Sequence, residues 1–256
     1  MKICSLNVNG IRAAYRRGVE DFFKDFDVFC LQEIKADAEL FSNITKYLAG
    51  SYHIYVNAAE KAGYSGVAVF TKTKPLKVLR EFPNQSLVKN EGRVLVIEFE
   101  TFFLVNCYVP HGGKRLELKL AFLKELKHGL DELKKIKPVV LAGDINIAHT
   151  EQDCSHPKLM SKITGFLPEE RRCFDELLAG GFTDAFRYIN PTSTKHSWSS
   201  YRTKASSYRG GFKSYTYRFD YFLADERLAN TVSGSDILHN IFYSDHYPIV
   251  LTFNPV

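Results

Sequence analysis

The sequence predicts a layered α+β fold with mixed β-sheets. Short apolar runs rich in Val, Ile and Phe alternate with longer amphipathic stretches along the whole chain. Two apolar runs, residues 93–99 and 102–109, lie too close together for a crossover helix, so we expect an antiparallel hairpin. The chain has 256 residues, 45% of them hydrophobic, and no Pro- or Gly-rich linker divides it. We therefore expect one domain spanning residues 1–256.

Several runs have the length and composition of strands. They are short, and their Val, Ile and Phe side chains suit a pleated surface that is buried on at least one face. We expect strands at residues 2–6, 28–31, 67–71, 93–99, 102–109, 139–142, 220–223 and 249–253.

Longer stretches have the spacing of helices. Residues 114–135 place Leu and Phe every three or four positions among Lys and Glu, so one apolar face can pack on a sheet. Another stretch ends at Gly180 and Gly181, and glycine commonly ends a helix. We expect helices at residues 19–26, 38–48, 114–135 and 169–178.

Composition and cysteine spacing narrow the class of protein. The net charge of +5 permits a polyanionic partner without requiring one. The five cysteines include no C-x-x-C pair, so we expect neither a disulfide framework nor a thiolate zinc site. The first residues lack a signal-peptide profile, and no apolar run approaches the roughly 20 residues that span a bilayer. We expect a cytoplasmic protein with no membrane partner.

Two motifs at the ends of apolar runs carry chemistry. Gly-Asp-Ile-Asn at residues 143–146 follows the run at 138–142, and Ser-Asp-His at residues 244–246 follows the run at 241–243. If both runs are strands, carboxylate, amide and imidazole groups meet at one sheet edge. These groups suit metal-assisted hydrolysis of a phosphate ester. Either motif alone is ordinary turn chemistry, but their combination favours a catalytic site.

Two more polar side chains follow apolar runs near the start of the chain. Asn7 follows the first predicted strand, and Glu33 comes shortly after the second. If these strands are neighbours, both side chains lie at the same edge, and Asp245 can join them. Mg²⁺ prefers carboxylate and amide oxygens. A lone Glu after a strand is usually a solvated loop residue, so the prediction of a magnesium site depends on this combination.

Short motifs occur in order along nearly the whole chain, from residue 2 to about residue 251. They are LNVNGIR at 6–12, LQEIK at 31–35, GYSGVA at 63–68, EGR at 91–93, YVP at 108–110, GDINIAH at 143–149, GF at 165–166 with ER at 170–171, RFDY at 218–221 and SDH at 244–246. Together they resemble the exonuclease III / apurinic-apyrimidinic endonuclease family. The wider superfamily shares the Glu, Asp-x-Asn and Ser-Asp-His elements, whereas the segments at 64–68 and 148–149 favour the DNA-repair branch.

The resemblance implies a fold and a cofactor. The family fold is a four-layer α/β sandwich, with two mixed sheets face to face and helices outside. The cofactor is Mg²⁺, with Mn²⁺ as a substitute. Glu33 is then the main metal ligand, and Asn7, Asn9 and Asp245 lie around the metal.

The resemblance also implies catalytic roles. Asp144 orients or deprotonates the attacking water, and Asn146 positions that water. His246 contacts the phosphate and is held by Asp220, while Tyr108 contacts the phosphate or the leaving group. Attack on an anionic phosphodiester needs its charge neutralised, which the metal and an imidazolium can do. Whether Asp144 or His246 takes the proton stays open.

The chain departs from the family at positions that bind substrate. Two of these positions lie in the pocket that holds a flipped-out sugar, and three lie where the family has asparagine. Phe219 is also expected in the sugar pocket. Apolar side chains at such positions cannot donate to a phosphate oxygen, which favours altered specificity over neutral drift. The five positions are, in that order, Ser197, Tyr217, His111, Met160 and Ile163.

Basic residues are expected to bind the DNA backbone. We expect Arg12, Lys35, Lys114, Lys158 and residues 209–213 to line a phosphate track. The segment between Arg202 and Tyr217, which contains residues 209–213, is a few residues longer than is usual in the family.

These expectations predict a Mg²⁺-dependent DNA repair nuclease that acts at 3′ ends. We expect 3′→5′ exodeoxyribonuclease and 3′-phosphodiesterase activity, with weak or absent incision at internal abasic sites. The partner is double-stranded DNA with 3′ ends, nicks or 3′ blocking groups, and the protein is a monomer. The alternatives are a full apurinic-apyrimidinic endonuclease, an inositol or lipid phosphodiesterase of the same superfamily, and an inactive DNA-binding module.

Overall fold

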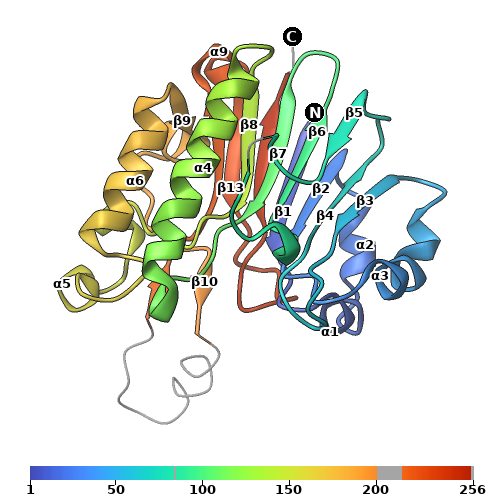
Figure 1. The fold of residues 1–256 in the computed structure, drawn as a ribbon, viewed down its shortest axis with the longest axis horizontal. Helices are drawn as coiled ribbons and strands as arrows, with labels where there is room; N and C mark the ends of the chain where they lie inside the picture. Colours follow the sequence, from blue (N-terminus) through green and yellow to red (C-terminus); the bar gives the residue numbers. More distant parts are fainter. Residues whose placement is uncertain (84, 201–214, 255–256) are drawn as a thin grey trace.

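Two six-stranded sheets face each other, and helices cover their outer surfaces (Figure 1). The structure is a computed structural model that describes residues 1–83, 85–200 and 215–254. One apolar layer lies between the two sheets, and one further apolar layer lies between each sheet and its own helices. The expected four-layer sandwich of two mixed sheets with outer helices is confirmed.

The first sheet brings the start and the end of the chain together. Two of its strands, β1 and β2, are parallel neighbours, and Asn7 pairs with Gln32. Their carboxyl ends therefore meet at one edge, as expected for Asn7 and Glu33. The strand order is β13 (Val232–Ile237), β14 (Ile249–Phe253), β1 (Lys2–Asn7), β2 (Val28–Gln32), β4 (Val67–Thr71) and β3 (His53–Asn57).

The second sheet contains the expected hairpin, since β6 and β7 pair antiparallel. β7 and β8 are parallel, and β12 runs antiparallel to β8. The strand order is β5 (Lys77–Leu79), β6 (Val94–Glu98), β7 (Phe103–Tyr108), β8 (Val139–Asp144), β12 (Asp220–Asp225) and β9 (Phe182–Asp184). A separate ribbon pairs β10 (Trp198–Ser199) with β11 (Thr216–Tyr217).

The helices pack by their apolar faces. α1 (Ile11–Tyr15), α2 (Val19–Phe23) and α3 (Ala38–Thr45) cover the first sheet, while α4 (Leu116–Lys134) and α6 (Pro168–Ala179) cover the second. The remaining short elements are α5 (Pro157–Met160), α7 (Ala185–Ile189), α9 (Glu226–Ala229), η1 (Lys46–Leu48), η2 (Lys89–Glu91), η3 (Gly113–Arg115) and η4 (Glu151–Asp153).

Among the residues described, no helix combines the length and the apolar character that crossing a bilayer requires.

Sequence patterns did not reveal the outer strands β3, β5, β9 and β13 or the ribbon of β10 and β11. β3, β5, β9 and β13 lie at sheet edges, where a strand can be short and partly exposed. The apolar run at residues 241–243, considered as a strand before the Ser-Asp-His motif, forms a loop instead. Phe242 is 61% exposed there, whereas Tyr243 packs on Phe22. The Ser-Asp-His motif therefore precedes β14 instead of following a strand.

A buried polar contact joins the two sheets near their shared edge. Gln32 Nε2 in β2 donates to Asn106 Oδ1 in β7 over 2.7 Å. Asn106 Nδ2 donates in turn to the carbonyls of Leu31 and Ala68 in the first sheet. Because Gln32 immediately precedes Glu33, this contact fixes where the first sheet presents Glu33 to the second.

Candidate active site

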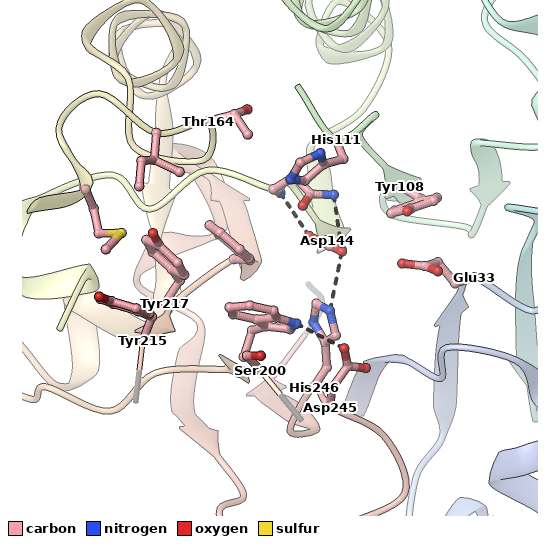
Figure 2. Close-up of a pocket in the computed structure, with 15 residues that line it drawn as sticks. Glu33, Tyr108, His111, Asp144, Thr164, Ser200, Tyr215, Tyr217, Asp245 and His246 are labelled. Atoms are coloured by element: carbon pink, nitrogen blue, oxygen red, sulfur yellow. Dashed lines mark hydrogen bonds and ion pairs between the residues drawn. The ribbon is translucent and has the colours of Figure 1, made fainter. Parts of the chain in front are cut away.

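Polar side chains converge where the strands of both sheets end (Figure 2). The carboxyl ends of β1, β2, β7 and β8 lie at this edge. β12 starts there, because Asp220 is opposite Asp144 in the antiparallel pairing. The loop before β14 adds an imidazole. The converging side chains are Asn7, Glu33, Tyr108, Asp144, Asp220 and His246.

Asn7 connects the two sheets. Its Nδ2 donates to Glu33 Oε1 over 2.8 Å and to Asp144 Oδ2 over 2.9 Å. Its side-chain oxygen accepts from the backbone N–H of Asn9 at 3.0 Å. Asn7, expected near the metal, is thus seen holding two carboxylates from opposite sheets in place.

Glu33, Asn9 and Asp245 are linked through Lys35 and the Asn9 amide. Lys35 Nζ lies 2.8 Å from Glu33 Oε2 and 2.5 Å from Asn9 Oδ1. Asn9 Nδ2 donates to Asp245 Oδ1 over 3.1 Å, and Trp198 Nε1 donates to Asp245 Oδ2 over 3.1 Å. This oxygen-rich group has the donor chemistry that a hard divalent cation such as Mg²⁺ prefers.

The carboxylates of this group are held in their charged form. Burial alone would raise the pKa of Glu33, but Lys35 and the Asn7 amide outweigh it, so the pKa lies below its usual value. Burial would likewise raise the pKa of Asp245, but His246 and three side-chain hydrogen bonds lower it. Both groups are therefore anionic at neutral pH, as metal ligands must be.

His246 lies between two aspartates. Its Nδ1 is 2.8 Å from Asp220 Oδ2, and its Nε2 is 3.8 Å from Asp144 Oδ2. Burial alone would lower the pKa of His246, but the charges of Asp220 and Asp144 raise it to about 10. The imidazole is therefore a cation at neutral pH, with Nε2 directed at Asp144 (Figure 2).

Among the carboxylates of this site, Asp144 has a pKa close to neutral pH. Burial raises its pKa to about 7, although His246 opposes the shift. Its Oδ1 accepts the backbone N–H of Asn146 at 2.9 Å, and Asn146 Nδ2 donates to the carbonyl of Val109 over 2.9 Å. Ligand atoms of Asp144, Asp220 and His246 lie within 4.8 Å of one another. Asp220 and His246 already hydrogen-bond each other and His246 forms an ion pair with Asp144, so these ligand atoms are engaged with one another and not free to hold a metal.

Tyr108 is held against a buried arginine. The Arg93 guanidinium lies 4.6 Å from the Tyr108 ring centre, and its Nη1 donates to the Tyr108 carbonyl over 3.1 Å. Burial, followed by the charges of Glu33 and Asp144, keeps the pKa of Tyr108 well above its ordinary value. The phenol is therefore protonated and can donate a hydrogen bond into the site.

The backbone at this edge adopts strained conformations. Six non-glycine residues in the described part of the chain have positive φ, and five of them lie at or beside this site. Such conformations cost on the order of 1–3 kcal/mol each and are kept where the surrounding contacts over-determine them. The five are Asn9, Glu33, Lys35, Ser65 and Asn146, with φ between 45° and 55°.

Ser197 corrects one sequence expectation. It is fully buried and absent from the cavity lining. Its Oγ donates to Asp220 Oδ2 over 2.6 Å and accepts the backbone N–H groups of Phe219 and Asp220. Trp198 lines the cavity instead, because successive side chains of an extended segment point to opposite sides. Ser197, expected to bind substrate, therefore orients Asp220 instead.

Beside the polar group, the cavity continues between aromatic rings. Its volume is about 620 Å³. Tyr217 and Phe219 stack with ring centres 4.6 Å apart, and Trp198 lies 5.8 Å from Tyr217. Sequence reasoning missed Trp198 and Tyr215, although aromatic residues alternate at 215, 217 and 219. The lining residues are Glu33, Tyr108, His111, Asp144, Asn146, Met160, Ile163, Thr164, Trp198, Ser200, Tyr215, Tyr217, Phe219, Asp245 and His246.

A buried ion network lies behind these rings. Arg218, between Tyr217 and Phe219 in sequence, is fully buried. Its Nε donates to Asp153 Oδ1 over 2.7 Å, and its Nη2 donates to Asp184 Oδ2 over 2.6 Å. Burial would raise the pKa of Asp153, but Arg218 outweighs it and lowers the pKa.

A second buried pair holds the loop that carries Met160 and Ile163. Lys119 Nζ donates to the Asn146 carbonyl over 2.7 Å and to Glu170 Oε1 over 2.6 Å. Glu170 also accepts the backbone N–H of Gly165 at 2.6 Å. The loop is thereby tied to the backbone of Asn146.

The expected basic track is brought together only in part. Lys35 reaches the polar group, whereas Arg12, Lys114 and Lys158 are exposed and absent from the cavity lining. Residues 209–213 lie outside the described residues.

Similarity to known proteins agrees with this geometry. A model of the Endonuclease/Exonuclease/phosphatase family matches residues 4–246. The chain is 36% identical to an exodeoxyribonuclease of Bacillus subtilis (strain 168), covering 99% of this chain and 100% of the relative. It is 38% identical to the DNA repair nuclease APEX1 of Danio rerio, covering 98% of this chain and 81% of the relative.

The fold also matches solved structures. An AP endonuclease from Archaeoglobus fulgidus superimposes with a TM-score of 0.86 and 26% identity, over 99% of each chain. The chain therefore belongs to the endonuclease/exonuclease/phosphatase family, as a nuclease of the exonuclease III / apurinic-apyrimidinic endonuclease type.

Proposed function

We propose that residues 1–256 act as one monomeric, Mg²⁺-dependent nuclease domain that hydrolyses phosphodiesters at the 3′ ends of DNA. The observation that carries the proposal is the pairing of Asp144 with cationic His246 at the wall of a cavity that also holds Glu33 and Asp245. This arrangement combines a base, a cation and a set of oxygen ligands within reach of one phosphate group.

Each polar residue has a role in this proposal. Glu33 and Asp245, with the Asn9 amide, would hold Mg²⁺, which when bound neutralises phosphate charge. Asp144, with its pKa near 7, is suited to take a proton from the attacking water. His246 stays protonated and contacts a phosphate oxygen, while Tyr108 donates to the phosphate or the leaving group.

DNA as the substrate is supported by three features. The curated relatives named above are DNA nucleases by name. The net charge of +5 is compatible with a polyanionic substrate. The stacked rings of Trp198, Tyr217 and Phe219 offer an apolar surface for a sugar or base beside the phosphate-facing groups.

Preference for 3′ ends is supported by the loops around the cavity. His111, Met160 and Ile163 line it where the family has asparagine. The apolar Met160 and Ile163 cannot donate to a flanking phosphate, and His111 places a bulky ring where a small amide is usual. A terminal nucleotide frays easily and needs little help, whereas flipping an internal one costs a few kcal/mol. Ser197 no longer supports this preference, since it does not face the cavity.

A full apurinic-apyrimidinic endonuclease is the second candidate. The cavity itself favours it, because Trp198, Tyr217 and Phe219 form an aromatic pocket next to Asp144 that could receive an extrahelical sugar. Tyr217, which departs from the family, still places an aromatic ring in this pocket.

One panel of substrates tests these proposals. Duplexes with a recessed 3′ end, a nick with a 3′ phosphoglycolate, and an internal abasic site are incubated with Mg²⁺, with Mn²⁺ and with EDTA. We expect trimming of both 3′ substrates in either metal, none in EDTA, and little incision at the internal site. Asp144→Asn should lower activity on every substrate by about 100-fold or more. Asp175→Asn, at an exposed aspartate paired with His149 outside the site, should behave as wild type.

Three results would contradict parts of the proposal. Activity that persists in EDTA would remove the metal. Incision of the internal abasic site as fast as 3′ trimming would establish the second candidate. Hydrolysis of an inositol or lipid phosphodiester without any cleavage of DNA would overturn the substrate class.

A further inference from the structure

Lys35 occupies an unusual position among the cations near the site. Its Nζ lies 2.8 Å from Glu33 Oε2 and 2.5 Å from Asn9 Oδ1. Glu33 is also the residue expected as the main metal ligand. An ammonium therefore already contacts an oxygen that a divalent cation would use.

The backbone holds Lys35 in this position. Its φ is +49°, a left-handed conformation that is uncommon for a lysine. Its N–H donates to the carbonyl of Ser65 over 2.9 Å, and the preceding Ile34 N–H donates to the carbonyl of Gly66 over 3.1 Å. The lysine side chain is 31% exposed, so the ammonium is less hydrated than that of a freely solvated lysine. These contacts aim the ammonium at Glu33.

The Lys35 ammonium and a divalent cation carry the same sign of charge, so they would oppose each other at Glu33. Two cations that share one carboxylate would repel each other, and partial burial would weaken the screening of that repulsion. Asn9 makes the conflict sharper, since its side-chain oxygen is also engaged by Lys35. An ion that used Glu33 and Asn9 together would therefore compete with Lys35 Nζ for their oxygens.

We propose that Lys35 competes with the divalent metal for Glu33 and Asn9 and thereby sets the metal affinity of the free enzyme. The inference rests on the proposed Mg²⁺ dependence. Without metal, the ammonium balances the charge of Glu33 and keeps the strained loop in its binding geometry. Metal binding then includes the free energy of displacing this internal cation.

The test measures metal binding directly, in protein free of DNA. Mn²⁺ is titrated into wild type and into Lys35→Met, and free Mn²⁺ is followed by electron paramagnetic resonance. Lys35→Met keeps the aliphatic stem but removes the charge. We expect its Mn²⁺ affinity to rise by on the order of tenfold.

Two variants control for charge and for general electrostatics. Lys35→Arg keeps a cation beside Glu33 and should bind Mn²⁺ about as weakly as wild type. Lys114→Met removes an exposed charge that is absent from the cavity lining, and should also bind Mn²⁺ within about twofold of wild type. Circular dichroism melts of all four proteins establish that each is folded at the temperature of the titration.

The outcomes separate this inference from the proposed function. If Lys35→Met bound Mn²⁺ no more tightly than the wild type, the proposed competition would be overturned. The proposed metal dependence would still stand in that case, provided that the wild type itself binds Mn²⁺. An equal rise for Lys114→Met would also overturn it, since the effect would then be one of overall charge. Failure of every folded variant, wild type included, to bind Mn²⁺ would overturn the metal dependence and the competition together.

Discussion

The two halves of the cavity are held in different ways. In the polar half, Asn7, Glu33, Asp144, Asp220 and His246 lie at strand ends or in the loop before β14, and they contact one another across the two sheets. In the aromatic half, Trp198, Tyr217 and Phe219 touch through ring packing and are supported from behind by buried ions. Figure 2 shows Glu33 and Tyr108 on one side of Asp144 and His246, and Tyr215 and Tyr217 on the other.

This difference separates chemistry from substrate choice. A side chain cross-linked to both sheets cannot move without disturbing the others, so we expect the polar half to be intolerant of change. A ring that is held by packing can be replaced with a smaller loss. Substitutions in the two halves should therefore differ in the size of their effect and in the kinetic constant they alter.

The largest effect is expected in the polar half. Glu33→Ala, Asp144→Asn and His246→Asn should each lower kcat by about 100-fold or more, because each removes a group that acts on the transition state. The melting temperature should change little, since these side chains contribute to a strand edge and not to the apolar core. Near-normal kcat in any one of them, measured on a recessed 3′ end, would remove that residue from the catalytic group.

The next largest effect concerns the choice between internal abasic sites and 3′ ends. kcat/KM on an internal abasic duplex should be about 100-fold lower than on a nicked, 3′-blocked duplex, because missing phosphate contacts cost on the order of 1–2 kcal/mol each. His111→Asn and Met160→Asn should narrow this gap.

Leu159→Asn is the matched control for these variants. Leu159 is 62% exposed, is absent from the cavity lining and neighbours Met160, so this variant should leave the gap unchanged. Equal rates on the two substrates in the wild type would contradict the predicted preference.

A smaller effect is expected in the aromatic half. Tyr217→Ala should reduce kcat/KM on a recessed 3′ end by about tenfold, mainly through KM, because base or sugar stacking on an aromatic ring contributes roughly 1–3 kcal/mol. Tyr188→Ala, at an exposed tyrosine outside the cavity, should have no such effect. A loss confined to kcat would place Tyr217 with the catalytic residues instead.

The pH profile of the polar half should reflect its two coupled groups. Asp144 must be ionised to accept a proton, so activity should rise as pH increases towards about 7, the pKa of this carboxyl. His246 must be protonated to contact phosphate, so activity should fall as pH passes about 10. Bound Mg²⁺ favours the ionised carboxylate and would move the acidic limb lower. Profiles of kcat/KM measured in Mg²⁺ test this, and an acidic limb that survives in Asp144→Asn would assign it to another group.

The ion network behind the aromatic half should titrate only in acid, and its effect should be the smallest. Arg218 lowers the pKa of Asp153 below the unfolded value of about 4. Its contribution to stability is therefore fully present above pH 4 and is lost as pH falls through the folded-state pKa. Urea unfolding between pH 7 and pH 3 should show the free energy of unfolding decreasing below about pH 4. An Asp153→Asn variant with the same pH dependence as wild type would exclude Asp153 as the cause.

Much of the fold could be predicted from local pattern. The central strands β1, β2, β4, β7, β8 and β14 are mainly apolar, because both faces of these strands are covered. The edge strands escaped notice, since a three-residue strand such as β5 makes most of its contacts with one neighbour and needs no long apolar run. The run at residues 241–243 resembles a strand in composition, but apolar side chains in a loop can also pack individually, as Tyr243 does on Phe22.

The order of the motifs along the chain was enough to determine the family. It also determined which functional groups the site contains, because metal-assisted hydrolysis needs carboxylate, amide and imidazole groups. Only the tertiary structure decided which atoms meet. The alternation of side chains in an extended segment turns Ser197 towards Asp220 and Trp198 into the cavity. Pairing of β12 with β8 places Asp220 opposite Asp144. A left-handed turn brings Lys35 onto Glu33. Each of these depends on backbone direction and strand register, which distant parts of the chain impose and which no local run of residues encodes.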